Sequence, residues 1–115
     1  MSTLRNKVQL IGNLGADPEI KELANDRIVA RFSIATSETR KDKEGKKVSE
    51  TTWHNLVAWG RLAEFAKNYL TKGKEIAIEG KLTNRSYEDK EGTRKYVTEI
   101  VVNELMMMNH KPNNN

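Results

Sequence analysis

Cysteine is absent from this chain of 115 residues, which excludes disulfide bonds and thiolate ligands for a metal. The only two histidines are His54 and His110, so a metal site would depend on scattered carboxylates, and we expect no metal and no cofactor. No apolar run approaches membrane-spanning length, and the first residues lack the apolar stretch of a signal peptide. These absences predict a cytoplasmic protein with no membrane partner.

Patterns typical of catalysis are missing as well. The segment Gly12-Asn13-Leu14-Gly15 lacks the lysine and the spacing of a phosphate-binding loop. His54 has no cysteine partner and no carboxylate at a recognisable catalytic spacing, and a histidine in a strand is more often a packed or interface residue than a base. We therefore expect that the protein is not an enzyme.

The charge balance permits a polyanionic partner without proving one. Lysine and arginine outnumber the acidic residues by 20 to 16, a formal net charge of +4. Such a charge attracts nucleic acids, but many basic proteins carry it only for solubility.

Hydrophobic periodicity predicts mostly strands. Alternation of apolar and polar residues indicates strands near 7–12, 28–35, 53–60, 75–83 and 95–106, whereas an i, i+3, i+4 pattern indicates a helix over 62–70. Residues 37–50 are expected to form a mobile hairpin loop. The order favours an all-β fold, a five-stranded OB-fold barrel with one helix between strands 3 and 4. We expect the barrel to occupy residues 1–106 as one domain, followed by a short disordered tail, residues 107–115.

Both tryptophans lie in one predicted strand, six residues apart. Because side chains alternate along a strand, Trp53 and Trp59 share a face with Asn55 and Val57, about 20 Å from end to end. Large aromatics in strands are usually core residues, and periodicity alone leaves open whether this face is core or surface.

Tyr87 favours the surface interpretation. It shares a face with Lys81, Thr83 and Arg85 in the fourth predicted strand, opposite the expected core face with Ile78 and Leu82. A tyrosine there can simply cover a loop. Together with two tryptophans, stacking on nucleic-acid bases explains it better, at about 1–3 kcal/mol per base.

The basic residues of the 37–50 segment allow two interpretations. They could bind phosphates, or they could belong to a solvated loop in which neighbouring acids offset their charge. Arg31, Arg61 and Lys72 are open to the same two interpretations. The segment holds Arg40, Lys41, Lys43, Lys46 and Lys47 among Glu38, Asp42, Glu44 and Glu50.

The chain resembles the bacterial single-stranded DNA-binding (SSB) protein family over nearly all of residues 5–106. The resemblance rests on several motifs in the right order, namely Asn6-Lys7-Val8, Ile11-Gly12-Asn13-Leu14-Gly15-Ala16-Asp17-Pro18-Glu19, Ala35-Thr36-Ser37, Trp53-His54, Leu62-Ala63-Glu64, Lys72-Gly73 and Ile78-Glu79-Gly80. It implies an OB fold, a homotetramer rather than a dimer, and sequence-independent binding of single-stranded DNA during replication, recombination and repair.

The resemblance also implies roles for individual residues. Trp53 is similar to the family's stacking tryptophan of strand 3, Trp59 stands at a base-contacting aromatic position, and Tyr87 stands where a stacking tryptophan is common. His54 and Lys7 fall at positions expected in subunit contacts. The full expected DNA-binding set is Trp53, Trp59, Tyr87, Asn55, Arg31, Arg40, Lys43, Arg61, Lys72 and Arg85.

Two features depart from the family pattern. Arg40 stands where some members have a further stacking tryptophan, although a guanidinium can still stack on a base. The chain stops at Asn115 without the acidic tip through which family members recruit replication and repair proteins, as a truncated form or a short paralogue would, so recruitment by that route stays an open question. The alternative is an OB-fold assembly module of primosome type, whose relatives generally lack the complete set of three aromatics.

Overall fold

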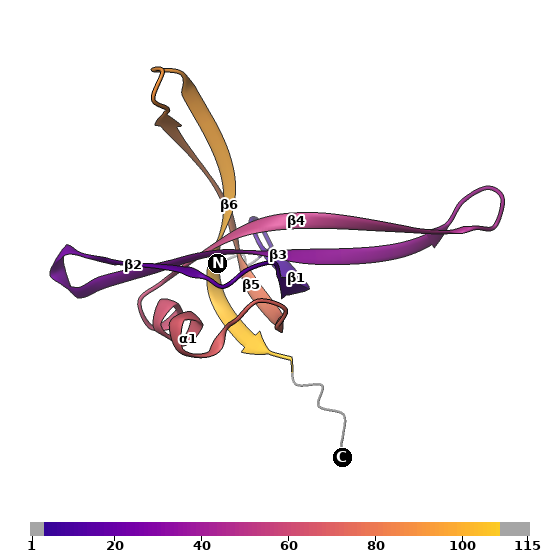
Figure 1. The fold of residues 1–115 in the computed structure, drawn as a ribbon, viewed down its shortest axis with the longest axis horizontal. Coiled ribbons are helices and arrows are strands. Elements are labelled where there is room, and N and C mark those ends of the chain that lie inside the picture. Colours follow the sequence, from indigo (N-terminus) through magenta and orange to yellow (C-terminus); the bar gives the residue numbers. More distant parts are fainter. Residues whose placement is uncertain (1–3, 109–115) are drawn as a thin grey trace, which may run out of the picture.

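The computed structural model describes residues 4–108, which form six strands, one α-helix and one short 3-10 helix. The helix α1 lies between the fourth and fifth strands along the chain (Figure 1). The elements are β1 (Val8–Leu14), β2 (Glu19–Leu23), η1 (Ala24–Asp26), β3 (Arg27–Lys41), β4 (Lys47–Trp59), α1 (Arg61–Tyr69), β5 (Glu75–Glu88) and β6 (Arg94–Met107).

Five of these strands close into a barrel. The sheet order is β1-β5-β6-β4-β3-β2, and an additional pairing between β1 and β3 closes the ring. This confirms the predicted all-β, five-stranded OB barrel with one helix. The sequence did not predict β2, which pairs only with β3 and holds only two apolar residues, Ile20 and Leu23. A short, mostly charged strand lacks the alternation by which strands are recognised.

The core is built from the inward faces of the strands and one face of α1. Alternating residues of β3 (Ile28, Ala30, Phe32 and Ile34) are buried, as the alternation predicted. The helix contributes Ala63 and Ala66. The remaining buried members of the cluster are Leu14, Leu56, Ala58, Leu70, Ile76, Ile78, Ile100 and Val102.

Two glycines let strands approach closely enough to close the barrel. A Cβ atom on Gly12 would lie 2.4 Å from the backbone oxygen of Ala35, where β1 approaches β3. A Cβ atom on Gly80 would lie 2.3 Å from the backbone oxygen of Val101, beside an irregularity in the β5–β6 register. Both contacts involve backbone, so a side chain at either position would separate the strands.

Two long hairpins project from the barrel in different directions (Figure 1). One is formed by β5 and β6 and the other by β3 and β4, which pair continuously as far as Lys41 and Lys47. The expectation of a mobile loop over 37–50 is therefore wrong, apart from a tight turn. There the Asp42 carboxylate accepts hydrogen bonds from the N–H groups of Glu44 and Lys46. Neither face of this arm is buried in a core, so its sequence shows no hydrophobic alternation.

Three further residues differ from the sequence expectations. Val57 shares the tryptophan face but is buried, because β4 lies between Arg31 of β3 and Val101 of β6. Leu82, expected on the core face, is 48% exposed because β5 has left the barrel at this point. Met107 ends β6 rather than beginning a tail, and residues 109–115 of the predicted tail lie outside the described residues.

Candidate nucleic-acid interface

The two tryptophans project from the outer surface of β4. Trp53 is 59% exposed and Trp59 is 38% exposed, whereas Leu56 and Ala58 on the opposite face are in the core. Their outward orientation, which periodicity had left open, is thus confirmed. Asn55 lies between them, paired with Ser33 of β3.

Trp53 rests against the segment that follows β1. A Cβ atom built on Gly15 would lie only 2.6 Å from Cζ3 of the indole, so the ring occupies the space that any side chain at 15 would need. The N–H group of Gly15 donates to the backbone oxygen of Ser33, which holds the segment beside β3. The glycine therefore sets the position of the Trp53 ring.

Trp59 has a cationic neighbour. The guanidinium carbon of Arg27 lies 5.0 Å from the centroid of the indole, a cation–π arrangement. Arg27 opens β3, and its strand pairs with the end of β4, where Val29 lies opposite Trp59. The sequence alone does not point to Arg27, because the contact depends on strand register.

A buried carboxylate lies at the polar centre of the same outer face. Glu99 of β6 is 8% exposed and accepts hydrogen bonds from two expected DNA-binding residues. Nη1 of Arg31 lies 2.6 Å from Oε2 of Glu99, while Nη2 and Nε of Arg85 lie 3.0 Å from Oε2 and 3.3 Å from Oε1. The cluster joins β3, β5 and β6.

These contacts set the ionisation of the cluster. The hydrogen bond from Arg85, aided by the charges of both guanidinium groups, holds the pKa of Glu99 below its ordinary value although burial opposes this. The same hydrogen bond raises the pKa of Arg85. The cluster is therefore fully charged at neutral pH, with two cations and one anion.

A hollow surrounds the cluster and brings predicted and unpredicted residues together. Arg31, Asn55 and Arg85 line it, together with the acidic residues Asp17, Glu19 and Glu99. No local pattern marks Asp17 and Glu19 as part of this site, because only the folded barrel brings their segment beside Arg31 and Arg85. Glu99 alone carried a usable signal, since it is a charged residue in an apolar strand, Glu99-Ile100-Val101-Val102.

Tyr87 lies further out on the β5–β6 arm. It is 47% exposed, and the guanidinium carbon of Arg85 lies 5.9 Å from its ring centroid. Arg85 thus contacts Glu99 on one side and approaches Tyr87 on the other. The structure links the expected stacking residue to the polar centre.

The other expected cations are less closely grouped. Arg40 pairs with Glu50 at 2.7 Å on the β3–β4 arm, so part of its charge is neutralised. Lys43 lies in the exposed turn of that arm, and Arg61 is the first residue of α1, two residues after Trp59. The backbone N–H of Lys72 donates to the Asp17 carboxylate, which places Lys72 beside the hollow.

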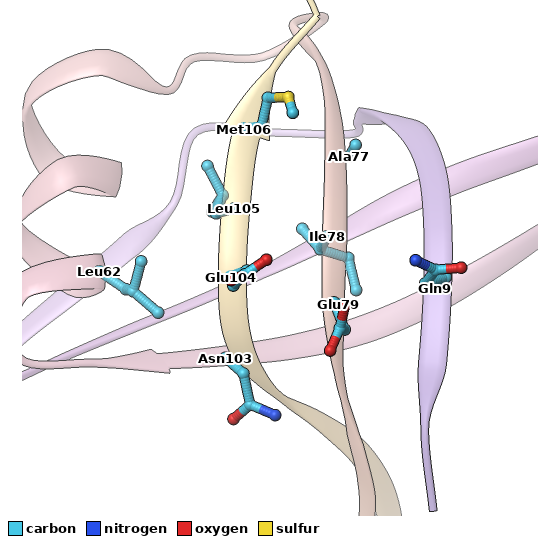
Figure 2. Close-up of a pocket in the computed structure, with 9 residues that line it drawn as sticks. All are labelled: Gln9, Leu62, Ala77, Ile78, Glu79, Asn103, Glu104, Leu105 and Met106. Atoms are coloured by element: carbon cyan, nitrogen blue, oxygen red, sulfur yellow. The ribbon is translucent and has the colours of Figure 1, made fainter. Parts of the chain in front are cut away.

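The two expected interface residues lie in different places. Nε2 of His54 is 3.0 Å from Oγ1 of Thr36, and the ring lines a small hollow with Trp53 and Leu82. Nζ of Lys7 is 3.5 Å from Oε2 of Glu79. Glu79 lines a second hollow over β1, β5 and β6, with Gln9, Ala77, Glu104 and Met106 (Figure 2).

Within residues 4–108 the side chains of histidine, aspartate and glutamate form no group of three or more that could hold a metal ion. In the same part of the chain, no helix has the length and apolar character to cross a membrane.

Comparison with known proteins identifies the family. The Single-strand binding protein family matches residues 5–108, which is most of the chain. The chain belongs to this family. Two curated proteins, each called Single-stranded DNA-binding protein 1, are similar to this chain. The protein from Chlorobaculum tepidum is 49% identical over 107 residues, and that from Xylella fastidiosa is 46% identical over 111 residues.

The coverage of these relatives differs. The aligned part spans 92% of this chain but 66% of the Chlorobaculum tepidum protein, slightly less than two thirds, and 96% of this chain but 82% of the Xylella fastidiosa protein. Among solved structures, the Plasmodium falciparum SSB complex with ssDNA superposes with a TM-score of 0.84 at 30% identity, covering 95% of this chain and 99% of that one. The family likeness therefore extends through the whole barrel and both arms.

Proposed function

We propose that this protein binds single-stranded DNA without sequence preference, along the outer face of β4 and the adjoining strands. The observation that carries the proposal is the set of three exposed aromatics, Trp53, Trp59 and Tyr87, around a cluster of arginines on one face. The names of the relatives and the structural neighbour's complex with ssDNA support it.

The chemistry of this face suits single strands. Every base has a π-face, so stacking on indole and phenol rings stabilises any sequence. The half-exposed Arg31 and Arg85 offer N–H groups to phosphates or bases, and Lys43, Arg61 and Lys72 extend the positive charge. Binding through these contacts makes and breaks no covalent bond.

Fluorescence titration with oligo-dT tests this function. Binding should quench tryptophan emission, and the logarithm of the affinity should fall with the logarithm of salt by about 0.7 per phosphate contacted. Tyr69→Ala is a matched control, because Tyr69 is an exposed aromatic, 56% accessible, on α1 rather than on β4. Unchanged emission and no binding at low salt would contradict the proposal.

We further propose that the active form is a homotetramer, with subunit contacts on the outer face of β1, β5 and β6. Ile11 and Met106, on β1 and β6, are 53% and 58% exposed, an unusual exposure for apolar side chains in neighbouring parts of a sheet. Glu79 lines the hollow on this face (Figure 2). Lys7 pairs with Glu79 and so adjoins the same face. His54 is proposed as a second subunit contact.

Solution mass measurement tests the assembly. Wild-type protein should have four times the chain mass, and Met106→Glu should yield a smaller species, because it places a charge in the apolar contact. A monomer for both proteins would contradict the tetramer. Tetramers without DNA binding would instead support the assembly-module alternative.

A role in replication, recombination and repair, in the cytoplasm at the nucleoid, accompanies the proposed DNA binding.

A further inference from the structure

Glu99 is an anion in the middle of a face proposed to bind a polyanion. It is 8% exposed and has a single ionised carboxylate, whose Oε2 accepts from both Arg31 and Arg85. Simple electrostatics predicts that an acid at this place weakens DNA binding, because it cancels one of the two arginine charges. Its position therefore requires a different explanation.

The arginines keep most of their hydrogen-bonding capacity. A guanidinium group carries five N–H donors. Arg31 uses one nitrogen on Glu99 and Arg85 uses two. The side chains of Arg31 and Arg85 are 41% and 45% exposed while that of Glu99 is 10% exposed, so the carboxylate lies beneath and the guanidinium groups remain accessible.

The cluster of Arg31, Arg85 and Glu99 also lies among the aromatic side chains proposed to stack on DNA. Its hollow is also lined by Asn55, which lies between the two tryptophans on β4. Arg85 in turn approaches the ring of Tyr87. A strand that stacks on these aromatics must cross the cluster.

We propose that Glu99 is a positioning residue for DNA binding, which holds Arg31 and Arg85 as one fixed set of donors between the stacking aromatics. The inference rests on the proposed function and deepens it. Without the carboxylate, each long arginine side chain would sample many rotamers, and fixing it on the DNA would cost conformational entropy at the moment of binding. Glu99 orders the two side chains when the protein folds.

Glu99→Gln and Glu19→Gln form a matched pair for the test. Glu19 lines the same hollow and is exposed, so its replacement removes an equal charge without releasing the two arginines. We expect Glu99→Gln to weaken oligo-dT binding by about fivefold to tenfold, the loss of roughly one charge-assisted hydrogen bond. Glu19→Gln should leave binding unchanged or make it up to about twofold tighter.

The salt dependence separates positioning from a merely structural role. For Glu99→Gln the slope should become shallower by about 0.7, one phosphate contact, although the protein has gained positive charge. Measurements are made well below the unfolding midpoint of each variant, with circular dichroism as the check on folding. Unchanged or tighter binding by a folded Glu99→Gln protein would overturn the inference.

Arg31→Lys provides a second test that keeps every charge and the carboxylate. Lysine cannot present a planar set of donors, so about threefold weaker binding is expected if geometry matters. Equal affinity for wild type and Arg31→Lys would also overturn the inference. Failure of the wild type to bind oligo-dT would overturn the proposed function and this inference together, whereas intact wild-type binding with unaffected variants would overturn this inference alone.

Discussion

The two tryptophans of β4 share a face but have different surroundings. Trp53 is the more exposed, at 59%, and its ring lies against Gly15, a residue without a side chain. Trp59 is 38% exposed, and Arg27 lies 5.0 Å from its ring centroid. The Trp53 ring is open to a ligand, whereas the Trp59 ring already has a cationic partner.

This difference indicates unequal shares in DNA binding. A base that stacks on the Arg27 side of Trp59 must displace the guanidinium group, and the lost cation–π contact subtracts about 0.5–1 kcal/mol from the gain. A base that stacks on Trp53 displaces no such cation. The Trp53 end of the β4 face is therefore expected to contribute more to the affinity for DNA than the Trp59 end.

Trp53→Ala should have the largest effect. We expect oligo-dT affinity to fall about tenfold to a hundredfold, because stacking contributes about 1–3 kcal/mol per base. The free energy of unfolding should change little, since the ring is mostly exposed. Titration and thermal unfolding measure the two effects, and a collapsed fold would show that Trp53 has a core role.

Trp59→Ala should weaken binding less, by about threefold to tenfold, because Arg27 offsets part of the stacking gain. Its cost in stability should exceed that of Trp53→Ala, since more of its surface is buried. The same two measurements apply to it. If Trp59→Ala weakens binding as much as Trp53→Ala, the two ends are equivalent.

Gly15→Ala tests what positions the Trp53 ring. The added methyl group overlaps the indole, so the ring must rotate away, and we expect about threefold weaker binding with altered emission. Gly45→Ala, at a turn of the β3–β4 arm with φ +82° and open surroundings, is a control for a glycine change remote from the indole. Normal affinity of a folded Gly15→Ala protein would show that this ring position is unimportant.

Arg27→Gln should reduce the contrast between the two ends. Without the guanidinium group, Trp59 becomes as available as Trp53, while one positive charge is lost, so the net change in affinity should be within about twofold. In this background, Trp59→Ala should weaken binding more than it does in the wild type. A double-mutant comparison by titration measures the difference, and exact additivity would contradict a role for Arg27 at this ring.

Acidification should act on the polar centre between the tryptophans, with no effect near neutral pH. The folded-state pKa of Glu99 lies below its ordinary value of 4.5. Its contribution to stability is therefore present above about pH 4.5 and is lost as the pH falls through the lowered pKa. Glu99→Gln should flatten this part of the stability profile in urea unfolding, whereas Glu19→Gln should leave its slope unchanged.

Much of this architecture could be predicted from the sequence because it depends on local periodicity. Alternation over 28–35 indicated which face of that strand is buried, and the i, i+3, i+4 pattern placed α1. Around Trp53, alternation indicated only that the two tryptophans share a face. The regular β3–β4 arm and the short β2 were missed, since neither contributes enough apolar surface to alternate. Exposed Leu82 and buried Val57 broke the pattern for a related reason: burial also depends on the neighbouring strands and on where a strand leaves the barrel.

The sequence by itself determined that the chain forms a small β barrel, that an aromatic set accompanies basic residues, and that the two tryptophans share one side of β4. Only the tertiary structure decided which groups meet on that side. Arg31 and Glu99 are 68 residues apart, and Arg27 reaches Trp59 through the register of β3 on β4. Such contacts follow from strand order and barrel closure, which are set by the packing of the whole core and not by any local run of residues.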